Sequence, residues 1–139
     1  MEGDLSVSLF KPWQVKTNVE RYGSILEVRN TLNSIFKVKI KEKNYLVPVT
    51  IEVISRGLFV VYLSNVPDGD GYQPVAECAA VRAAEECLKE LIAENKDFQF
   101  DTQTIVDTIE ECVSKRLKRK LGAFAQARVK CGSISIEDI

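Results

Sequence analysis

The chain has 139 residues, of which 45% are hydrophobic and 28% are charged, and its formal net charge is −1. This is the balance of an ordinary globular domain, and it excludes a disordered or collagen-like chain. No apolar run approaches the roughly 18 residues of a membrane span, and residues 1–10 lack the pattern of a secretory signal. We therefore expect a single domain over residues 1–139, in the cytoplasm or the nucleus, with no membrane partner.

The cysteine and histidine content argues against metal sites and common catalysis. The chain has no histidine, and its four cysteines are Cys78, Cys87, Cys112 and Cys131. No two cysteines are spaced as Cys-x-x-Cys, so we expect no metal and no cofactor. We expect reduced thiols, with Cys87 acting as a small core residue. Without histidine a Ser–His or Cys–His pair is excluded, so we expect no enzyme. An enzyme would need buried acids that converge in a pocket.

Charge is segregated along the chain. Residues 66–112 hold twelve acidic and three basic side chains, whereas residues 113–130 hold seven basic side chains and no acidic one. The basic cluster consists of Lys115, Arg116, Lys118, Arg119, Lys120, Arg128 and Lys130. Such a cluster attracts the phosphates of a nucleic acid or another acidic partner. It is also explained by cations that favour the last turns of a helix. We favour this structural explanation, and both stay open.

The first third of the chain is read as a short arm followed by an ambiguous segment. Residues 4–10 alternate apolar and polar, which predicts a short strand within an N-terminal arm of residues 1–17. In residues 18–33, apolar side chains lie on a helical stripe, whereas Ile25, Leu26 and Val28 would equally form a strand. We favour the helix.

Three strands are predicted next. Phe36, Val38 and Ile40 alternate with a row of lysines, Lys37, Lys39 and Lys41. Residues 45–53 alternate again, and Pro48 indicates an unpaired side near the start of that strand. A turn at residues 55–57 then leads into residues 58–63, which are apolar throughout and predict a strand buried on both faces. We expect these three strands to form an antiparallel meander.

Two helices are predicted after the strands. From Pro74 onward an apolar stripe begins with alanines, which would let the helix approach the sheet closely. A second helix starts with Asp101 or Thr102 as its cap and continues as a basic helix over residues 113–130. Its apolar seam is Ile105, Ile109, Val113, Leu117, Leu121 and Phe124. Ile134 and Ile136 alternate with polar residues, which indicates a short terminal strand. This strand and the one at residues 4–10 would pair with each other or with another chain.

The expected fold class is therefore α+β. It consists of an antiparallel β-meander of at least three strands with an alanine-faced helix packed on one face, plus a C-terminal amphipathic helix. Residues 18–96 would form the α/β core, and residues 97–139 a C-terminal helical extension.

Residues 79–91, Ala-Ala-Val-Arg-Ala-Ala-Glu-Glu-Cys-Leu-Lys-Glu-Leu, resemble the second helix of double-stranded-RNA-binding domains. The resemblance covers about residues 18–94 and implies a helix, three antiparallel strands and a second helix. Where that family has lysines that grip the phosphates of a duplex, this chain has Val75, Ala76, Glu77 and Cys78. It thus resembles degenerate members, which implies a protein-interaction or dimerisation module. A second resemblance is to small antitoxins of the HicB type, with a strand, a Val-Pro turn and an acidic alanine-rich helix.

Two functional hypotheses follow. The first is a non-enzymatic protein-interaction or assembly module that forms a homo-oligomer or binds a protein partner in a larger complex. It rests on the terminal strands, the proline-marked sheet edge and the length of the second helix. The second is a nucleic-acid-binding, specifically RNA-binding, protein that uses the basic helix 113–130, joined by Lys37, Lys39, Lys41 and Lys43. We favour the first, because the acidic overall charge argues against a general nucleic-acid binder.

Overall fold

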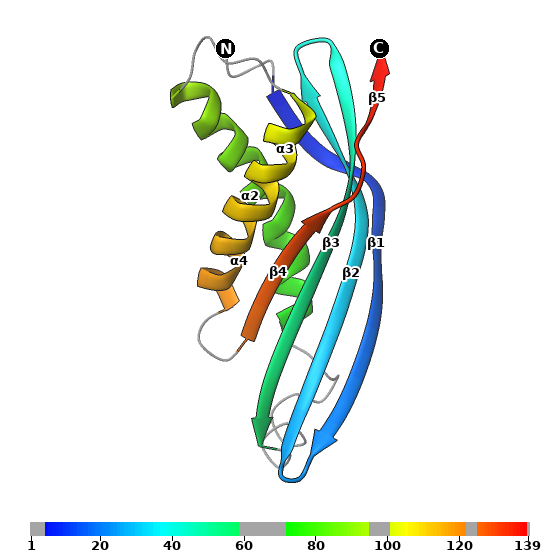
Figure 1. The fold of residues 1–139 in the computed structure, drawn as a ribbon, viewed down its shortest axis with the longest axis vertical. Helices are drawn as coiled ribbons and strands as arrows, with labels where there is room; N and C mark the ends of the chain where they lie inside the picture. Colours follow the sequence, from blue (N-terminus) through cyan, green and yellow to red (C-terminus); the bar gives the residue numbers. More distant parts are fainter. Residues whose placement is uncertain (1–4, 59–71, 95–100, 122–124, 139) are drawn as a thin grey trace.

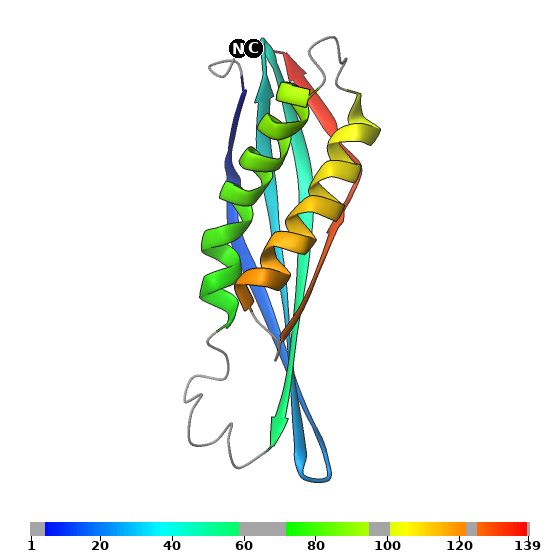
Figure 2. The same ribbon diagram turned by 90° about the vertical axis from the view of Figure 1, so that its left-hand side faces the viewer.

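The computed structural model describes residues 5–58, 72–94, 101–121 and 125–138. In chain order the elements are β1(Leu5–Tyr22), β2(Ile25–Ile40), β3(Lys43–Leu58), α2(Tyr72–Glu94), α3(Thr102–Thr108), the π-helical turn η2(Ile109–Val113), α4(Ser114–Leu121), β4(Ala125–Cys131) and β5(Ser135–Asp138). The strands form one antiparallel five-stranded sheet in the order β1-β2-β3-β4, with β5 also paired to β3. All the described helices lie on one face of this sheet (Figures 1 and 2). The predicted α+β class is confirmed.

The meander consists of long strands joined by two-residue turns. β1 and β2 meet at Gly23 and Ser24, where Gly23 has a φ of 60°, and β2 and β3 meet at Lys41 and Glu42, where Lys41 has a φ of 56°. Positive φ at such positions is typical of tight hairpins.

The helix favoured for residues 18–33 is therefore wrong. The chain reverses at Gly23, which brings Val19 opposite Val28 on the neighbouring strand. The helical stripe arose because residues on both sides of a hairpin turn happened to be apolar at helical spacing. The β-branched residues on both sides of the turn instead suit a pleated sheet.

The predicted turn at residues 55–57 is also wrong. Ser55, Arg56 and Gly57 continue β3 and pair with Val28, Glu27 and Leu26 of β2. The meander therefore consists of β1, β2 and β3, and residues 59–63 of the predicted third strand lie outside the described residues. The residue types at positions 55–57 favour a turn locally, but β2 is long enough to pair with β3 along the whole length of β3, which keeps these residues in the strand.

Pro48 shows how β3 tolerates a proline. The carbonyl of Pro48 accepts a 2.9 Å hydrogen bond from the Gly132 N–H, so its backbone faces the segment between β4 and β5. The N–H that proline lacks would point the same way. The missing donor thus falls where the chain passes from β4 to β5. The unpaired side predicted near the start of this strand is limited to this point, because β5 pairs with Lys43–Leu46 and β4 pairs from Val49 onward.

The core lies between the sheet and the helices. The predicted alanine face of α2 is buried, with Ala76, Ala80 and Ala84 fully inaccessible, and Leu88 fills the space further along the helix. From the sheet side Phe36 and Ile51 are fully buried against it. The alanine-faced helix on the meander is therefore confirmed.

The second helix starts and packs as predicted. Asp101 is the N-cap, and its side chain accepts a 2.7 Å hydrogen bond from the Thr104 N–H, which lowers the pKa of this carboxyl. Its buried seam comprises Ile105, Ile109, Val113, Leu117 and Leu121, whereas Phe124 lies outside the described residues.

The predicted basic helix over residues 113–130 is wrong in its second half. The helix ends at Leu121, and residues 125–131 form β4. Ala125 and Val129 are buried while Gln126, Arg128 and Lys130 are exposed. This is the two-residue period of a strand, and β4 completes the sheet beside β3.

The expected division into an arm, a core and a helical extension does not describe this fold. β1 pairs with β2 along nearly its whole length, and β4 and β5 of the C-terminal segment pair with β3. The two terminal strands join the same sheet without pairing with each other.

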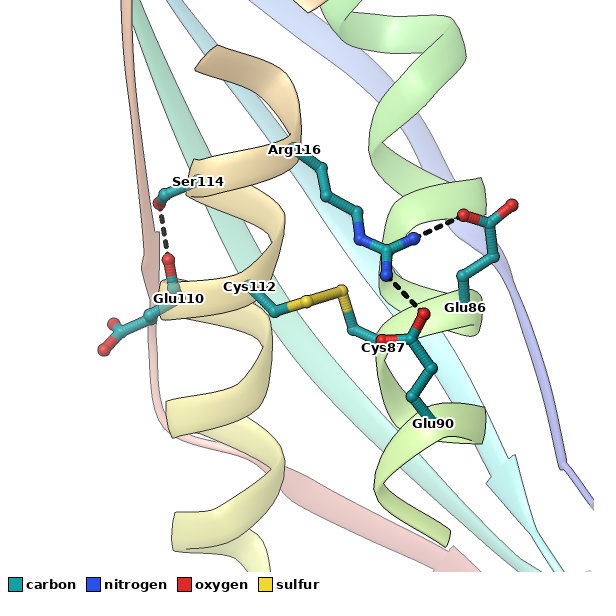
Figure 3. Close-up of a disulfide and its surroundings, with 7 residues drawn as sticks. All are labelled: Glu86, Cys87, Glu90, Glu110, Cys112, Ser114 and Arg116. Atoms are coloured by element: carbon teal, nitrogen blue, oxygen red, sulfur yellow. Dashed lines mark hydrogen bonds and ion pairs between the residues drawn. A yellow bond between two sulfur atoms is a disulfide. The ribbon is translucent and has the colours of Figure 1, made fainter. Parts of the chain in front are cut away.

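Two of the cysteines contradict the prediction of reduced thiols. Cys87 of α2 and Cys112 of η2 form a disulfide with a Cα–Cα distance of 6.2 Å (Figure 3). Cys131 is free, and Cys78 lies in a part of α2 whose side chains are outside the described residues. Structural disulfides are rare in the cytosol, so this bond weighs against the location expected from the sequence.

Candidate binding surface on the open face of the sheet

The five-stranded sheet has one face that no described element covers, and we call it the open face (Figure 1). Cross-strand neighbours share a face. Paired residues such as Thr31 and Glu52, or Asn33 and Thr50, therefore stand together on the side opposite the helices. The Thr50 hydroxyl donates a 2.7 Å hydrogen bond to Asn33 Oδ1 on this surface.

The open face is predominantly basic. The register places on it eight basic side chains, Lys11, Lys16, Arg29, Lys37, Lys39, Arg56, Arg128 and Lys130, and four acidic ones, Glu20, Glu27, Glu52 and Glu137. Between these charges lie serine, threonine, asparagine and glutamine side chains together with apolar ones, such as Ile25, Ile35, Leu46 and Ile54. The charges of this surface are therefore predominantly positive although the whole chain has a net charge of −1.

One acidic residue pairs with two of these basic side chains near the β1–β2 turn. Glu27 is buried, and its Oε1 lies 3.5 Å from a guanidinium nitrogen of Arg29 and 3.3 Å from one of Arg56. For the other six basic residues of the open face no ion pair is found within the described part of the chain. These six, Lys11, Lys16, Lys37, Lys39, Arg128 and Lys130, are the candidate binding residues.

The predicted basic cluster is divided between the two sides of the molecule. Lys115, Arg116, Lys118, Arg119 and Lys120 lie on α4, in the helical layer. Arg128 and Lys130 lie on the open face, paired with Glu52 and Thr50 of β3. One surface therefore cannot use all seven residues, because the sheet separates the two groups.

Arg116 is engaged within the fold. Its guanidinium lies 2.6 Å from Glu86 Oε2 and 2.6 Å from Glu90 Oε1, which ties α4 to α2 beside the disulfide (Figure 3). The hydrogen bond to Glu90 raises the pKa of Arg116 further. Lys118, Arg119 and Lys120 occupy the last turn of α4, where cations stabilise the helix dipole. The ion pairs of Arg116 and the helix dipole therefore give these four residues of α4 a structural role.

The lysine row predicted for the sheet is partly on the open face. Lys37 and Lys39 are there, whereas Lys41 is in the β2–β3 turn. Lys43 is the first residue of β3, and its side chain is on the opposite face of the sheet, the one that the helices cover. Sequence reasoning missed Lys11, Lys16, Arg29 and Arg56 as members of this surface. Alternation of Val28 and Leu32 with Arg29 and Thr31 was the available signal, and the expected helix concealed it.

The described residues also include one pocket outside the open face. A shallow groove runs along α2 and is lined by Val81, Arg82, Glu85, Glu86 and Lys89, so its acids belong to one exposed helix surface. Among the described residues, no three metal-ligating side chains gather at one place. No described helix is long and apolar enough to cross a membrane.

The free thiol of Cys131 is on the inner side of β4. Burial, together with the charge of Glu110, raises its pKa to about 12. Its backbone N–H donates a 2.8 Å hydrogen bond to Glu110 Oε2, so this carboxylate fixes the strand to the helix. A thiol that stays protonated is a poor nucleophile.

No protein-family model matches the chain, and no curated protein or solved structure is significantly similar to it. The likeness of residues 79–91 to the second helix of double-stranded-RNA-binding domains therefore remains a sequence resemblance. The order of elements it implied differs from the structure, because β1 stands where the first helix was expected.

Proposed function

We propose that the protein is a non-enzymatic binding module whose open face binds a nucleic acid through its phosphate backbone. The observation that carries this proposal is the row of basic side chains on a sheet face that no described helix covers. Each phosphate that a lysine or arginine neutralises releases counterions and adds affinity.

The neutral residues of the open face support the same partner. Phosphate and sugar contacts are made by arginine and lysine together with serine, threonine, asparagine and glutamine. The open face carries residues of these types, such as Ser8, Gln14, Asn18, Asn33 and Thr50. The centre of a protein–protein interface, by contrast, is enriched in aromatic residues and depleted in lysine.

A duplex fits this surface better than a single strand. Proteins that hold single strands stack the bases on aromatic side chains. Among the residues with a register partner, Tyr22 at the far end of the hairpin is the aromatic side chain on the open face. β2 has 16 residues, which corresponds to about 50 Å, or about 15 base pairs of a duplex.

A paired charge reversal tests the proposal. Duplex RNA and duplex DNA labelled with a fluorophore are titrated with the full chain at 50 mM salt, and binding is followed by fluorescence anisotropy. The variant Lys37→Glu/Lys39→Glu changes the open face, and Lys118→Glu/Lys120→Glu changes the net charge equally on α4. We expect the first variant to bind at least tenfold more weakly and the second to bind like the wild type.

The competing hypotheses predict different results. Loss of binding only in the α4 variant would contradict the proposal and would indicate that the basic helix is the interface. Absence of binding to either duplex at 50 mM salt would exclude a nucleic-acid backbone as the partner, which would favour a protein partner. For the proposed mode, raising the salt from 50 to 200 mM should weaken binding roughly a hundredfold or more.

A further inference from the structure

The outer edge of β1, which pairs with no described strand, has two halves with different properties. In the first half the edge is protected, because Pro12 and two register shifts between Leu9 and Gln14 interrupt it. The Val7 N–H at this edge donates a 3.4 Å hydrogen bond to Glu85 Oε2 of α2. Prolines, bulges and covering side chains are devices that prevent edge strands from pairing with other chains.

The second half, Gln14–Tyr22, has no proline and no register shift. It pairs with β2 in an unbroken register, so its other edge is straight. It also exposes apolar side chains, since Val15 is 38%, Val19 55% and Tyr22 58% accessible. A regular, partly apolar edge of nine residues is a template for another strand.

The backbone direction along this half follows from the contacts of the sheet. The N–H of Val7 points away from β2. The backbone N–H and C=O groups of its register partner Val38 therefore point away from β1, toward β3. The backbone N–H and C=O groups of even-numbered residues of β2 therefore point toward β3. Those of odd-numbered residues, such as Arg29 and Asn33, point toward β1. The Pro48 carbonyl, which faces Gly132, gives the same alternation from the other side of the sheet.

In the second half of β1, residues that bond to β2 alternate with residues whose backbone N–H and C=O groups point away from β2. Gln14 and Asn18 are partners of Asn33 and Arg29 and so bond inward. The N–H and C=O groups that face outward belong to Val15, Thr17, Val19 and Arg21.

We propose that two copies of this chain associate by antiparallel pairing of their Gln14–Tyr22 segments about a two-fold axis at Asn18. This axis places Thr17 opposite Val19 of the second copy and Val15 opposite Arg21 of the second copy. All four are residues whose backbone groups face outward, which is the arrangement that the cross-copy hydrogen bonds of an antiparallel ladder need.

The same axis is favoured by charge. It places Lys16 opposite Glu20 of the second copy, twice by symmetry, and both side chains stand on the open face. Opposite charges on directly facing residues stabilise a strand pair, and like charges destabilise it. A shift of one residue would lose this pairing and turn the side chains to the wrong faces.

The pairing joins two sheets into one and keeps both open faces on the same side, because the two-fold axis is perpendicular to the sheet. It uses the backbone edge of β1 together with Lys16 and Glu20 of the open face, and the other five candidate binding residues lie outside the paired segment. The inference therefore stands whether or not those five residues bind a nucleic acid.

Charge exchange tests this register. Sedimentation equilibrium of the full chain over a concentration series gives the dimer dissociation constant for the wild type and for Lys16→Glu, Glu20→Lys and the double variant. We expect each single variant to raise the dissociation constant about tenfold or more, because both pairs become repulsive. The double variant should restore a value close to that of the wild type, and Lys39→Glu, which lies outside the segment, should change little.

A backbone variant provides the second measurement. Val19→Pro removes an N–H that faces outward and is not used by β2, which an edge strand tolerates. We expect a folded monomer with an unchanged circular dichroism spectrum. A wild type that stays monomeric at several hundred micromolar would overturn the proposal, as would a dimer that neither the charge variants nor Val19→Pro weaken.

Discussion

Cys87 and Cys112 are 25 residues apart in the sequence and form a disulfide between α2 and the π-helical turn η2. Cys87 is buried, and Arg116 bridges the same two helices one turn further along. The two helices are therefore held together by a covalent bond and two ion pairs as well as by the apolar seam.

Removal of the disulfide should destabilise the chain by about 3 kcal/mol, because the closed loop restricts the unfolded state. The measurement is urea unfolding of Cys87→Ala, Cys112→Ala and the double variant, compared with the wild type in the presence and absence of a reductant. Either single variant should equal the double one, since each breaks the same bond. A wild type whose unfolding midpoint is insensitive to reductant would contradict this prediction.

The Arg116 ion pairs should contribute about 1 kcal/mol, since the guanidinium is only 28% accessible and meets two carboxylates. Arg116→Gln should lower the free energy of unfolding by this amount at low salt and by less at 1 M salt. Lys115→Gln on the same helix is the matched control, because the side chain is exposed and no ion pair is found for it within the described residues. Equal effects of the two variants would show that the bridge adds nothing.

The contact of Glu85 with β1 should make stability depend on pH. A hydrogen bond from Lys89 and a second from the Val7 N–H lower the pKa of Glu85 in the folded state. Its charged form therefore stabilises the fold above the unfolded pKa, and this contribution is lost as the pH falls through the folded value. Glu85→Gln should cost about 0.5 kcal/mol at pH 7 and nothing at pH 3.

The reference for that measurement is the variant Glu111→Gln. Glu111 is exposed on η2, and its carboxylate has no described partner. Urea unfolding of both variants at pH 7 and pH 3 separates the specific contact from the general effect of removing a negative charge. A Glu85→Gln deficit that persists at pH 3 would contradict an electrostatic contribution.

The thiol of Cys131 should be nearly inert in the folded chain. With its pKa raised from 9.0 to about 12 by burial and by Glu110, the thiolate fraction at pH 8 falls about a thousandfold. Alkylation by iodoacetamide, resolved by site with mass spectrometry, should be slower at Cys131 by about this factor than in the urea-unfolded chain. Similar rates in both states would contradict the burial of this side chain.

The close approach of α2 to the sheet should make the alanine face intolerant of larger residues. Ala80 is fully buried, so Ala80→Leu should cost about 1–3 kcal/mol through overpacking. Ala93 of the same helix is exposed, and Ala93→Leu should change the free energy of unfolding by less than about 0.5 kcal/mol. Thermal or urea unfolding compares the two, and equal effects would mean that the helix does not dock through this face.

Local patterns along the chain were sufficient for several elements. The alternation from Phe36 to Ile40, the alanine stripe and the Asp101 cap each depend on neighbours within a few residues, and the structure has all three as predicted. Lys37 and Lys39 were assigned to the solvated face of the sheet for the same reason.

The candidate binding surface depended on contacts between distant residues. Arg128 and Lys130 belong to it because β4 pairs with β3, which is more than 70 residues away in sequence. Read as a helix, the same two residues would have joined the cations of α4. The spacing of the cysteines did not predict the disulfide between Cys87 and Cys112.

The amino-acid sequence by itself determined which side chains need burial and hence the class of the fold, because the period of the apolar residues is a local property. Only the tertiary structure decided where residues 18–33 turn, which face carries each cation and which edge of the sheet stays free. These outcomes depend on strand partners that the chain selects by the burial and hydrogen bonding of the whole sheet, and no short segment contains that information.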